Sequence, residues 1–573
     1  MTIHNPEIAK LFNQYAVLLE VKGANPFRVR AYRNAARTVE NLPRDIAAML
    51  QEGADLTELP GIGEDLAHKL SDIVATEQFG ELEKLKHRVP VALAELTEVP
   101  GIGPKRVKAL FKALKISSLD QLFRAARDGR LKRVKGFGPK MIAGILKVAG
   151  RHPGAPARHR LSDAEHIVQS LVPHLESARG VSKVVVAGSF RRRKDTVGDL
   201  DFLVTAKTRS NVVEHFVSYG EVADVLAKGP TKASVRLKSG MQVDLRVVAE
   251  RSYGAALLYF TGSKAHNVAL RAMGLKRGLK INEYGLFKGA RWLAGRSEEE
   301  MYAKLGLPYI EPELRENQGE IAAAAAGKLP KLLRQSDIRG DLHVHTKASD
   351  GEATLEEMVV AAGMLGYEYI AITDHSKHIG ITHGLDARRL SAQIRDIDRL
   401  NAKGRGPIVL KSAEVDILPD GRLALPNSIL AELDLVVASV HSKFDLPAQA
   451  QTDRMIRAMD NPYVNIIAHP FGRLIGERDP CELDLQLLME AALERGCYLE
   501  VNAQPSRLDL SDVQCRMAKE LGLKLAISTD AHTPETLSYM RYGVDQARRG
   551  WLSARDVLNT RGLVDLKKLL RRC

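Results

Sequence analysis

The 573-residue chain contains little cysteine, few aromatic side chains and no long hydrophobic run. Its four cysteines lie far apart in the last hundred residues, which excludes a disulfide framework and a Cys-x-x-Cys metal site and favours a reducing cytoplasm. No segment reaches the roughly 18 consecutive apolar residues of a membrane span, and the N-terminus lacks a signal-peptide pattern. Aromatic residues make up only 5% of the chain, yet a hydrophobic fraction of 45% excludes intrinsic disorder. We therefore expect a cytoplasmic, globular protein without a membrane partner.

The charge of the chain is unevenly distributed. The residues before Asp337 include 54 basic and 36 acidic side chains, a net charge of +18, whereas the residues from Asp337 onward carry −4. A basic region of this size attracts polyanions. The front of the chain is therefore predicted to bind a polyanion, and charge alone does not say which one.

Sequence patterns divide the chain into regions with different predicted secondary structure. Residues 1–150 show the apolar spacing of short helices, and a segment rich in proline and glycine follows at residues 151–157. Strand-like runs occur at residues 183–187, 201–205, 234–237 and 243–248. Helical patterns then continue to about residue 305, and an alanine-rich segment at 319–336 is predicted to be a linker or a helix leading into one. From Asp337 onward, short strands alternate with helices, which predicts a parallel α/β sheet or barrel.

Three similar glycine-containing turns interrupt the helical patterns of residues 1–150. Their glycine pairs are Gly61 and Gly63, Gly101 and Gly103, and Gly136 and Gly138. Glycine permits the positive φ of a tight turn between two helices, and the free N–H groups of the second helix form an anion site. Three such turns predict contacts with a nucleic-acid backbone, the alternative being simple helix termination. They resemble helix–hairpin–helix motifs.

A group of carboxylates lies near the middle of the chain. Asp199 and Asp201 alternate along a predicted strand, so both side chains face one way and repel each other unless a cation lies between them. With Asp244 from another strand, they suit two Mg²⁺ ions that clamp the oxygens of a phosphoryl transfer. Upstream, Ser189 and Arg192 can donate hydrogen bonds to phosphate. The alternative is a Gly-Asp turn whose acids cap helices or pair with the adjacent basic residues.

Residues 1 to about 318 resemble the family X DNA polymerases, the group that contains polymerase beta. The nucleotidyltransferase signature GS-x-RR-x(5)-GD-x-D matches at Gly188, Ser189, Arg191, Arg192, Gly198, Asp199 and Asp201. The family's Tyr-Phe-Thr-Gly-Ser turn begins at Tyr259. The resemblance implies an α+β palm in which Asp199, Asp201 and Asp244 are the catalytic residues and hold Mg²⁺.

The resemblance also implies nucleotide and DNA contacts. The nucleotide-binding residues would be Gly188, Ser189, Arg192, Arg160, Tyr259, Phe260, Gly262 and Asn267, and the DNA-binding residues would be Arg271 and the six hairpin glycines. Tyr259, Phe260 and Gly262 would flank the incoming sugar and exclude a 2′-hydroxyl. Without the resemblance, this segment predicts a helix N-terminus capped by Ser263.

The first 86 residues resemble the small lyase domain of the same family. In that domain a lysine forms a Schiff base with an abasic sugar, which requires a lowered lysine pKa. The matching residue is Lys69, but Glu64 and Asp65 lie close in sequence and would raise its pKa. A solvated helix lysine is therefore favoured over a lyase nucleophile.

Histidine is concentrated in the rear of the chain. Eight of the 17 histidines lie after Asp337, and six of them fall at or just after the ends of predicted strands, together with acidic residues. Imidazoles and carboxylates that converge from many strands are what a multinuclear Mn²⁺, Zn²⁺ or iron site requires. A single histidine at a strand end is usually structural, but this repetition predicts a metal site.

The segment from about Asp337 to Cys573 resembles the polymerase-and-histidinol-phosphatase (PHP) domain, a distorted β/α barrel with a trinuclear metal centre. All nine of its ligand positions are matched, at His343, His345, Asp350, His375, Glu414, His441, His469, Asp530 and His532. The resemblance implies that Glu414 bridges two metals and that up to three Mn²⁺ or Zn²⁺ ions bind. It also implies a phosphoesterase that trims DNA as a 3′–5′ exonuclease, with abasic-site endonuclease or 3′-phosphatase activity left open.

These inferences combine into a multidomain protein. The expected segments are a lyase-like helical domain (1–86), a second helical domain with two hairpins (87–150), a palm (158–250), a nucleotide-selection subdomain (251–318), a linker (319–336) and a PHP domain (337–573). The predicted function is gap filling in DNA base excision repair by a monomer that uses gapped or primed DNA and dNTPs. The alternatives are a small-molecule phosphatase localised by its front half and a catalytically silent scaffold that bridges DNA ends.

Overall fold

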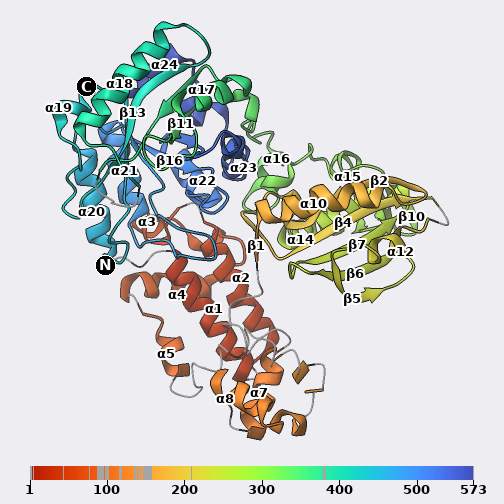
Figure 1. Cartoon of the computed structure of the whole chain (residues 1–573). Helices are drawn as coiled ribbons and strands as arrows, with labels where there is room; N and C mark the ends of the chain where they lie inside the picture. Colours follow the sequence, from red (N-terminus) through yellow and green to blue (C-terminus); the bar gives the residue numbers. More distant parts are fainter. Residues whose placement is uncertain are drawn as a thin grey trace. The chain divides into compact units, whose positions relative to one another are not determined.

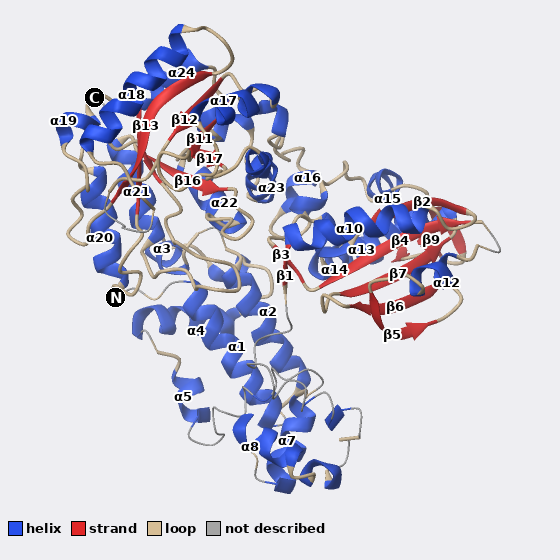
Figure 2. Ribbon diagram, in the orientation of Figure 1, coloured by secondary structure: helices blue, strands red, loops and turns tan. Residues whose placement is uncertain are grey.

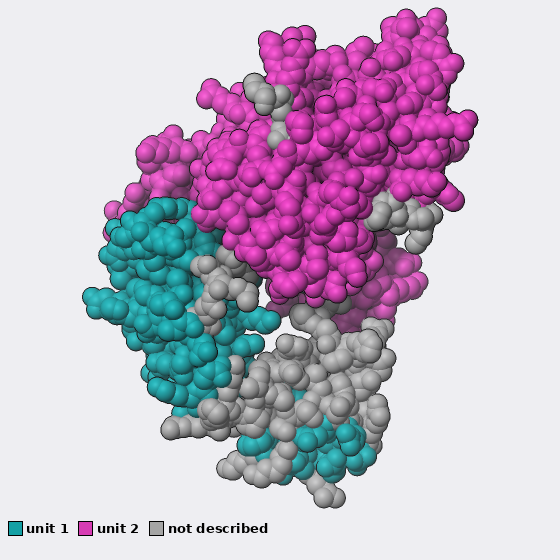
Figure 3. Space-filling model, turned by 90° about the vertical axis from the view of Figure 1, so that its left-hand side faces the viewer, with its two compact units in different colours: residues 1–158 teal, residues 159–573 magenta. Residues whose placement is uncertain are grey.

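The computed structural model describes residues 3–571 except 4, 23, 43, 77, 87–95, 97–101, 115, 117–118, 135–136, 139–140, 143–144, 146–157, 208–209 and 378–381. The chain forms two compact units, residues 1–158 and 159–573 (Figure 3). None of the helices described in either unit is long and apolar enough to cross a membrane.

The first unit is built from short helices (Figure 1). They are α1 (Asn5–Lys22), α2 (Pro26–Glu40), α3 (Ile46–Gln51), α4 (Glu64–Thr76), α5 (Gly80–Lys86), α7 (Pro104–Leu114) and α8 (Leu119–Arg127). The Asn25 side chain accepts a hydrogen bond from the Phe27 backbone N–H, which caps the start of α2. Four aromatic rings, those of Phe12, Tyr15, Tyr32 and Phe79, pack edge to face or tilted in its core.

The second unit begins with the palm, a five-stranded mixed sheet in the order β2-β4-β7-β6-β5 (Figure 2). Its strands are β2 (Val181–Val186), β4 (Asp199–Ala206), β5 (Val222–Lys228), β6 (Lys232–Leu237) and β7 (Gln242–Val248). The short strands β1 (His159–Arg160) and β3 (Thr196–Val197) pair beside them, and the helices are α10 (Leu161–Glu176), α11 (Gly188–Arg191) and α12 (Val212–Val217). Because β4 and β7 are parallel neighbours, the residues at the start of both strands lie side by side at the same end of the sheet.

A smaller α/β subdomain follows the palm. Its elements are α13 (Tyr253–Thr261), α14 (Lys264–Lys276), β8 (Lys280–Asn282), β9 (Gly285–Lys288), β10 (Arg291–Ala294), α15 (Glu298–Lys304) and α16 (Glu320–Ala325). Ser263 caps α14 by accepting a hydrogen bond from the His266 N–H, so the predicted N-cap is confirmed. The alanine-rich segment forms α16, and Ala324 lies in the core of this subdomain.

The rear of the unit is a seven-stranded parallel sheet that runs in sequence order. The strands are β11 (Gly340–Val344), β12 (Tyr369–Ile372), β13 (Ile408–Asp416), β14 (Leu435–Ser439), β15 (Ile466–Ile467), β16 (Tyr498–Asn502) and β17 (Leu525–Ser528). A bridge between Val344 and Ala531 joins the two end strands, so the barrel is nearly closed. This arrangement confirms the predicted fold class.

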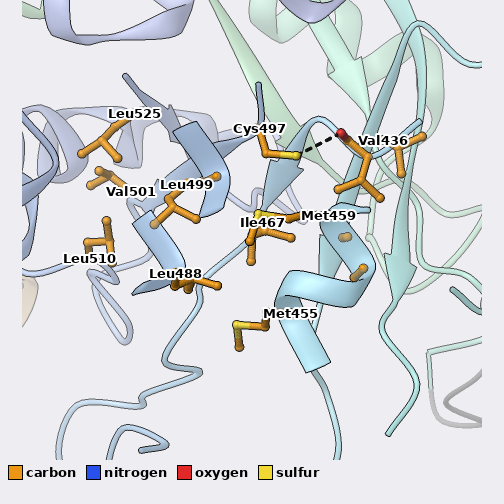
Figure 4. Close-up of a cluster of buried hydrophobic side chains, with 14 of the residues drawn as sticks. Val436, Met455, Met459, Ile467, Leu488, Cys497, Leu499, Val501, Leu510 and Leu525 are labelled. Atoms are coloured by element: carbon orange, nitrogen blue, oxygen red, sulfur yellow. Dashed lines mark hydrogen bonds between the residues drawn. The ribbon is translucent and has the colours of Figure 1, made fainter. Parts of the chain in front are cut away.

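Helices cover the outside of this barrel. They are α17 (Leu355–Met364), α18 (Ala387–Ala402), α19 (Asn427–Leu430), α20 (Ala448–Met459), α21 (Leu485–Arg495), α22 (Asp512–Leu521), α23 (Met540–Arg549) and α24 (Leu563–Leu570). Figure 4 shows Met455 and Met459 of α20 and Leu488 of α21 beside strand residues such as Ile467 and Leu499. Three free cysteines, Cys481, Cys497 and Cys515, are buried in this core, and Cys573 lies outside the described residues.

The palm and the barrel share buried contacts within this unit. Leu508, after β16, and Tyr542, on α23, belong to the hydrophobic core of the palm. Trp551, after α23, belongs to the core of the small α/β subdomain. The palm core is therefore completed by side chains from the barrel.

Candidate functional sites

The three glycine turns have the same backbone arrangement where they are described. Gly63, Gly103 and Gly138 each accept hydrogen bonds from the N–H groups three and four residues later, so the second glycine starts the following helical turn. The first turn is complete, and Gly61 has φ of +80°. Gly101 and Gly136 lie outside the described residues. After the first turn, the N–H groups of the first residues of α4 are left available to an anion.

Lys69 lies in a cluster of charged and aromatic side chains. Its Nζ is 2.5 Å from Asp65 and 3.4 Å from Glu81, and it stacks on the Tyr32 ring at 5.5 Å. Its side chain is only 13% exposed, so the predicted solvated lysine is wrong. Burial acts to lower the pKa of Lys69, but its contacts with Asp65, Tyr32 and Glu81 outweigh burial and raise it. A protonated lysine is a poor nucleophile.

The palm brings its three carboxylates together. Asp201 on β4 is the direct register partner of Asp244 on β7, and Asp199 lies two residues earlier on β4. Gln242 donates a hydrogen bond to Asp244 at 3.0 Å, and Ser234 donates another. Burial, followed by the charges of Asp199 and Asp244, raises the pKa of Asp201 to about 7. A cation between these carboxylates would relieve that repulsion.

The Gly-Ser turn lies directly against this carboxylate group. Gly188 begins α11 with φ of +64°, and a Cβ added there would lie 2.5 Å from Asp201 Oδ2. The Ala187 N–H also donates to the Asp201 carbonyl at 2.7 Å. Only glycine allows the turn that carries Ser189 to approach the carboxylate this closely.

The two arginines of the signature have different partners. Arg191 forms a bidentate pair with Glu298 at 2.7 and 2.9 Å and donates to Thr261, so it joins the palm to the next subdomain. Arg192 donates to Glu316 at 2.9 Å and to the Thr261 carbonyl. Neither Glu298 nor Glu316 can be recognised from the sequence, because a salt-bridge partner distant in sequence leaves no spacing pattern.

The residues expected at the nucleotide lie around the end of α13 and the start of α14. Tyr259 and Phe260 pack edge to face at 5.1 Å, and Gly262 follows α13. Asn267 donates to the Tyr259 carbonyl at 2.7 Å, and Arg271 donates to the Asn267 carbonyl at 3.3 Å. Tyr259, Asn267 and Arg271 line one open pocket with Leu270 and Asn282.

Arg160 lies apart from these residues in the structure. Its guanidinium donates to the Ile475 carbonyl at 3.3 Å and pairs with Glu477, both in the barrel loop after β15. This contact places Arg160 at the junction of palm and barrel. Its role as a triphosphate contact stays a prediction.

Glu414 is the centre of the histidine cluster in the barrel. It lies at the C-terminal part of β13 and is 1% exposed. Imidazole nitrogens of five histidines lie 2.8–3.6 Å from its carboxylate oxygens: His343, His345, His375, His441 and His469. One carboxylate that faces five imidazoles suits a bridging ligand between metal ions.

The remaining predicted ligands extend the same cluster. Asp530 lies 3.1 Å from His345 Nε2, while Asp350 lies 3.4 Å from His375 Nε2 and 3.5 Å from His532 Nε2. Among the described residues, three groups have ligand atoms close enough together to hold a metal ion: His345, Asp350, His375 and His532; His343, His345 and Asp530; and His375, Glu414 and His441. All nine predicted ligands therefore converge at one end of the barrel.

The chemistry of the cluster fits metal ions. Glu414 Oε2, His345 Nδ1 and His469 Nδ1 are buried without a hydrogen bond from the described residues. Burial and the charge of His375 lower the pKa of His345 to about 4, whereas the charge of Glu414 outweighs burial and raises the pKa of His375 and His441. Burying polar atoms without a partner costs folding free energy unless a cation binds them.

Further buried acids form hydrogen bonds with the predicted ligands. Glu500, on β16, accepts from His343 Nδ1 at 2.8 Å and from the His469 N–H at 2.9 Å. Asp416, two residues after Glu414, contacts His441 Nδ1 at 3.0 Å. Neither role has a signature in the sequence beyond the position of Asp416 two residues after Glu414.

The front of the chain matches four families. Residues 3–79 match a helix-hairpin-helix domain, residues 93–150 a SAM-like helix-hairpin-helix tandem, residues 157–240 the DNA polymerase beta palm, and residues 256–316 the DNA polymerase beta thumb. Residues 341–503 match the PHP domain. These matches follow the order of the structural regions.

Several curated proteins are similar to the chain. The DNA polymerase/3′-5′ exonuclease PolX of Bacillus subtilis is 38% identical over 574 residues, covering 100% of both chains. A probable phosphatase of Thermoanaerobacter is 32% identical over 233 residues, which is 38% of this chain and 89% of the relative. DNA polymerase lambda of Rattus norvegicus is 25% identical over 349 residues, which is 55% of this chain and 57% of the relative.

The fold and the two sites define a polymerase-beta-like nucleotidyltransferase joined to a metal-binding PHP barrel. The 38% identity to the Bacillus subtilis PolX over the full length of both chains identifies the group within this class. The chain belongs to the PolX family of DNA polymerases.

Proposed function

We propose that the chain is a DNA-directed DNA polymerase that fills short gaps during repair, with a 3′–5′ exonuclease in its barrel. The observation that carries the proposal is the presence of two separate ligand clusters, the Asp201–Asp244 pair in the palm and the group around Glu414 in the barrel. DNA and dNTPs are the substrates of such an enzyme. Its chemistry depends on divalent metal ions.

In the palm, Asp199, Asp201 and Asp244 would hold Mg²⁺. These oxygen ligands match the preference of that ion, which when bound would activate the primer 3′-hydroxyl and neutralise the leaving phosphates. Ser189 and Arg192 lie on the turn against Asp201, where they would bind the triphosphate. Tyr259, Phe260, Gly262 and Asn267 would fit the sugar and base, because they surround the α13–α14 junction beside Arg192.

The helix starts after the glycine turns would grip the DNA backbone. Backbone N–H groups bind phosphates without reading bases, and a net charge of +18 before Asp337 favours polyanion binding. Arg271 would contact the template strand. Lys69 is not assigned to lyase chemistry, because its acidic neighbours raise its pKa.

In the barrel, six histidines, two aspartates and Glu414 would hold up to three Mn²⁺ or Zn²⁺ ions. Imidazole nitrogens favour later transition metals over Mg²⁺, and the bound metals would supply the nucleophile for phosphoester hydrolysis. Glu500 and Asp416 orient His343 and His441. Abasic-site endonuclease and 3′-phosphatase activity are further candidates, because probable phosphatases are similar to this barrel.

The proposal is tested on a single gapped DNA. Primer extension with Mg²⁺ and dNTPs is expected, and degradation from the 3′ end is expected with Mn²⁺ and no dNTPs. Two further substrates, one with a 3′-phosphate and one with an abasic site, are assayed in the same way to show which other phosphoesters the barrel cleaves. A purified chain that retains its metals and neither extends nor degrades the gapped DNA would contradict the proposal.

A further inference from the structure

An arginine of the loop after β16 lies against the metal-ligand cluster of the barrel. Arg507 Nε is 3.6 Å from Asp530 Oδ2, a charge contact that is too long for a hydrogen bond. The loop is tied to the same ligand, because Gln504 donates to the Asp530 carbonyl at 2.8 Å and the Arg507 N–H donates to the Gln504 carbonyl at 2.8 Å. The fold thus fixes the Arg507 backbone beside a predicted metal ligand.

The guanidinium of Arg507 differs from those of other poorly exposed arginines in the barrel. Arg454 donates three hydrogen bonds to backbone carbonyls, and Arg473 donates to the carbonyls of Arg507 and Leu508. The Arg507 side chain is 21% exposed, yet no described residue accepts a hydrogen bond from its guanidinium. Its five donors are therefore available to a ligand at the cluster.

A second cation lies close to Arg507. Arg478 stacks on the Phe444 ring at 4.1 Å, and burial together with the charge of Arg507 lowers its pKa. The positive charges of these two arginines repel each other. An anion bound between the metal ligands and this loop would relieve the repulsion.

We propose that Arg507 binds the phosphate of the DNA 3′ end on which the barrel acts. The inference rests on the proposed phosphoesterase function and adds the residue that positions its substrate. A guanidinium fork can donate two hydrogen bonds to phosphate oxygens. Arg473 is a positioning residue, because its hydrogen bonds to Arg507 and Leu508 fix the loop.

The competing explanation is that Arg507 only balances the charge of Asp530. In that case its removal would alter metal binding and leave phosphate affinity per loaded site unchanged. If Arg507 binds substrate phosphate, metal content stays normal and phosphate affinity falls. The two explanations are therefore separated by measuring both quantities.

The experiment uses the full-length chain loaded with Mn²⁺. Wild type, Arg507→Ala, Arg507→Lys and the control Arg395→Ala are compared, since Arg395 is an exposed arginine on α18. Bound Mn²⁺ is measured by elemental analysis, the affinity for inorganic phosphate by calorimetry, and KM and kcat for 3′ degradation by gel assay. Thermal unfolding checks that each variant is folded.

Arg507→Ala is expected to keep wild-type Mn²⁺ content and to weaken phosphate affinity about 10- to 100-fold, because the phosphate loses its charge-assisted hydrogen bonds to the guanidinium. Arg507→Lys should fall between wild type and alanine, because it keeps the charge and loses the fork. Wild-type phosphate affinity in a folded lysine or alanine variant would overturn the proposal. The titration requires no turnover, so a wild type that binds phosphate but does not degrade DNA would count against the proposed exonuclease and not against Arg507.

Discussion

At the scale of single residues, the two sites differ in the groups that surround their buried carboxylates. In the palm, Asp199, Asp201 and Asp244 lie together, and the pKa of Asp201 is raised to about 7 by burial and by the other two charges. In the barrel, Glu414 is surrounded by imidazoles. The first set offers oxygen ligands to a hard cation, and the second offers mainly nitrogen ligands.

Asp199→Ala should abolish nucleotide addition and leave DNA affinity nearly unchanged. Asp199 belongs to the carboxylate group of the palm, whereas the predicted backbone-binding turns belong to residues 1–150. Extension and equilibrium binding are measured on the same gapped DNA. Equal losses of binding and extension would contradict the assignment of Asp199 to the chemistry.

Glu500→Gln should lower the metal affinity of the barrel. The carboxylate fixes the orientation of His343 and also accepts the His469 N–H, and the loss of such a partner typically costs about 10- to 100-fold in metal affinity or activity. Mn²⁺ affinity is measured by competition with a chelator. The control is Glu482→Gln, an exposed glutamate near α21, and an Mn²⁺ affinity in Glu500→Gln equal to that of the control would refute the positioning role.

The sequence predicted the metal cluster better than the groups that support it. Six histidines with acidic residues recur at strand ends and predict a metal site, the resemblance to the PHP domain implies the nine ligands, and the structure brings all nine together. Glu500 and Arg507 have no such signature. Glu500 lies on β16 and Arg507 in the loop after it, and only the folded barrel brings them to the metal-ligand cluster.

At the scale of elements, the strands with a buried face were predictable and the others were not. Strands β2, β4, β6 and β7 lie close to their predicted ranges. β5 was missed because nearly all of its side chains are exposed at the sheet edge, which leaves no alternating pattern. The strands β8, β9 and β10 are only three or four residues long, too short to show a period.

Gly254→Ala should destabilise the contact between α13 and the start of α15. A Cβ at Gly254 would lie 2.1 Å from the backbone of Ser297, so α13 must move away from a segment that cannot yield by rotating a side chain. The expected loss is about 1–3 kcal/mol of unfolding free energy. Chemical denaturation measures it, and Gly220→Ala, with no atom within 4 Å of its added Cβ, is the control. Equal stability of the two variants would show that the contact yields easily.

At the scale of the whole molecule, residues 159–573 behave as one unit in which the barrel completes the palm. Leu508 and Tyr542 lie in the palm core, and the Tyr542 hydroxyl donates to Glu165 at 2.6 Å. Arg549 of α23 is 1% exposed, donates to the Arg192 carbonyl at 2.6 Å and pairs with Asp512. The sequence did not predict this junction, because its contacts join residues more than 300 positions apart.

Removal of residues 337–573 should abolish 3′ degradation and leave gap filling detectable but thermally fragile. The fragment keeps the palm carboxylates, yet it loses apolar contacts from Leu508 and Tyr542 and the ion-pair partners of Arg193 and Glu316. Each kcal/mol of unfolding free energy that is lost lowers the unfolding midpoint by about 2–4 °C in a domain of this size. Thermal unfolding and extension assays test this, and metal-dependent degradation by the pure fragment would overturn the division of labour.

The independence of the polymerase and exonuclease sites is tested most directly by inactivating each site separately and measuring both activities on the same gapped DNA. Wild type, Asp201→Ala and the double variant His343→Ala with His345→Ala are assayed for Mg²⁺-dependent extension and Mn²⁺-dependent 3′ degradation, with bound metal measured in each. Asp201→Ala is expected to lose extension and keep degradation, while the double variant is expected to lose degradation and bound transition metal and keep extension. Loss of both activities in either folded variant, or normal degradation and metal content in the double variant, would contradict two independent sites.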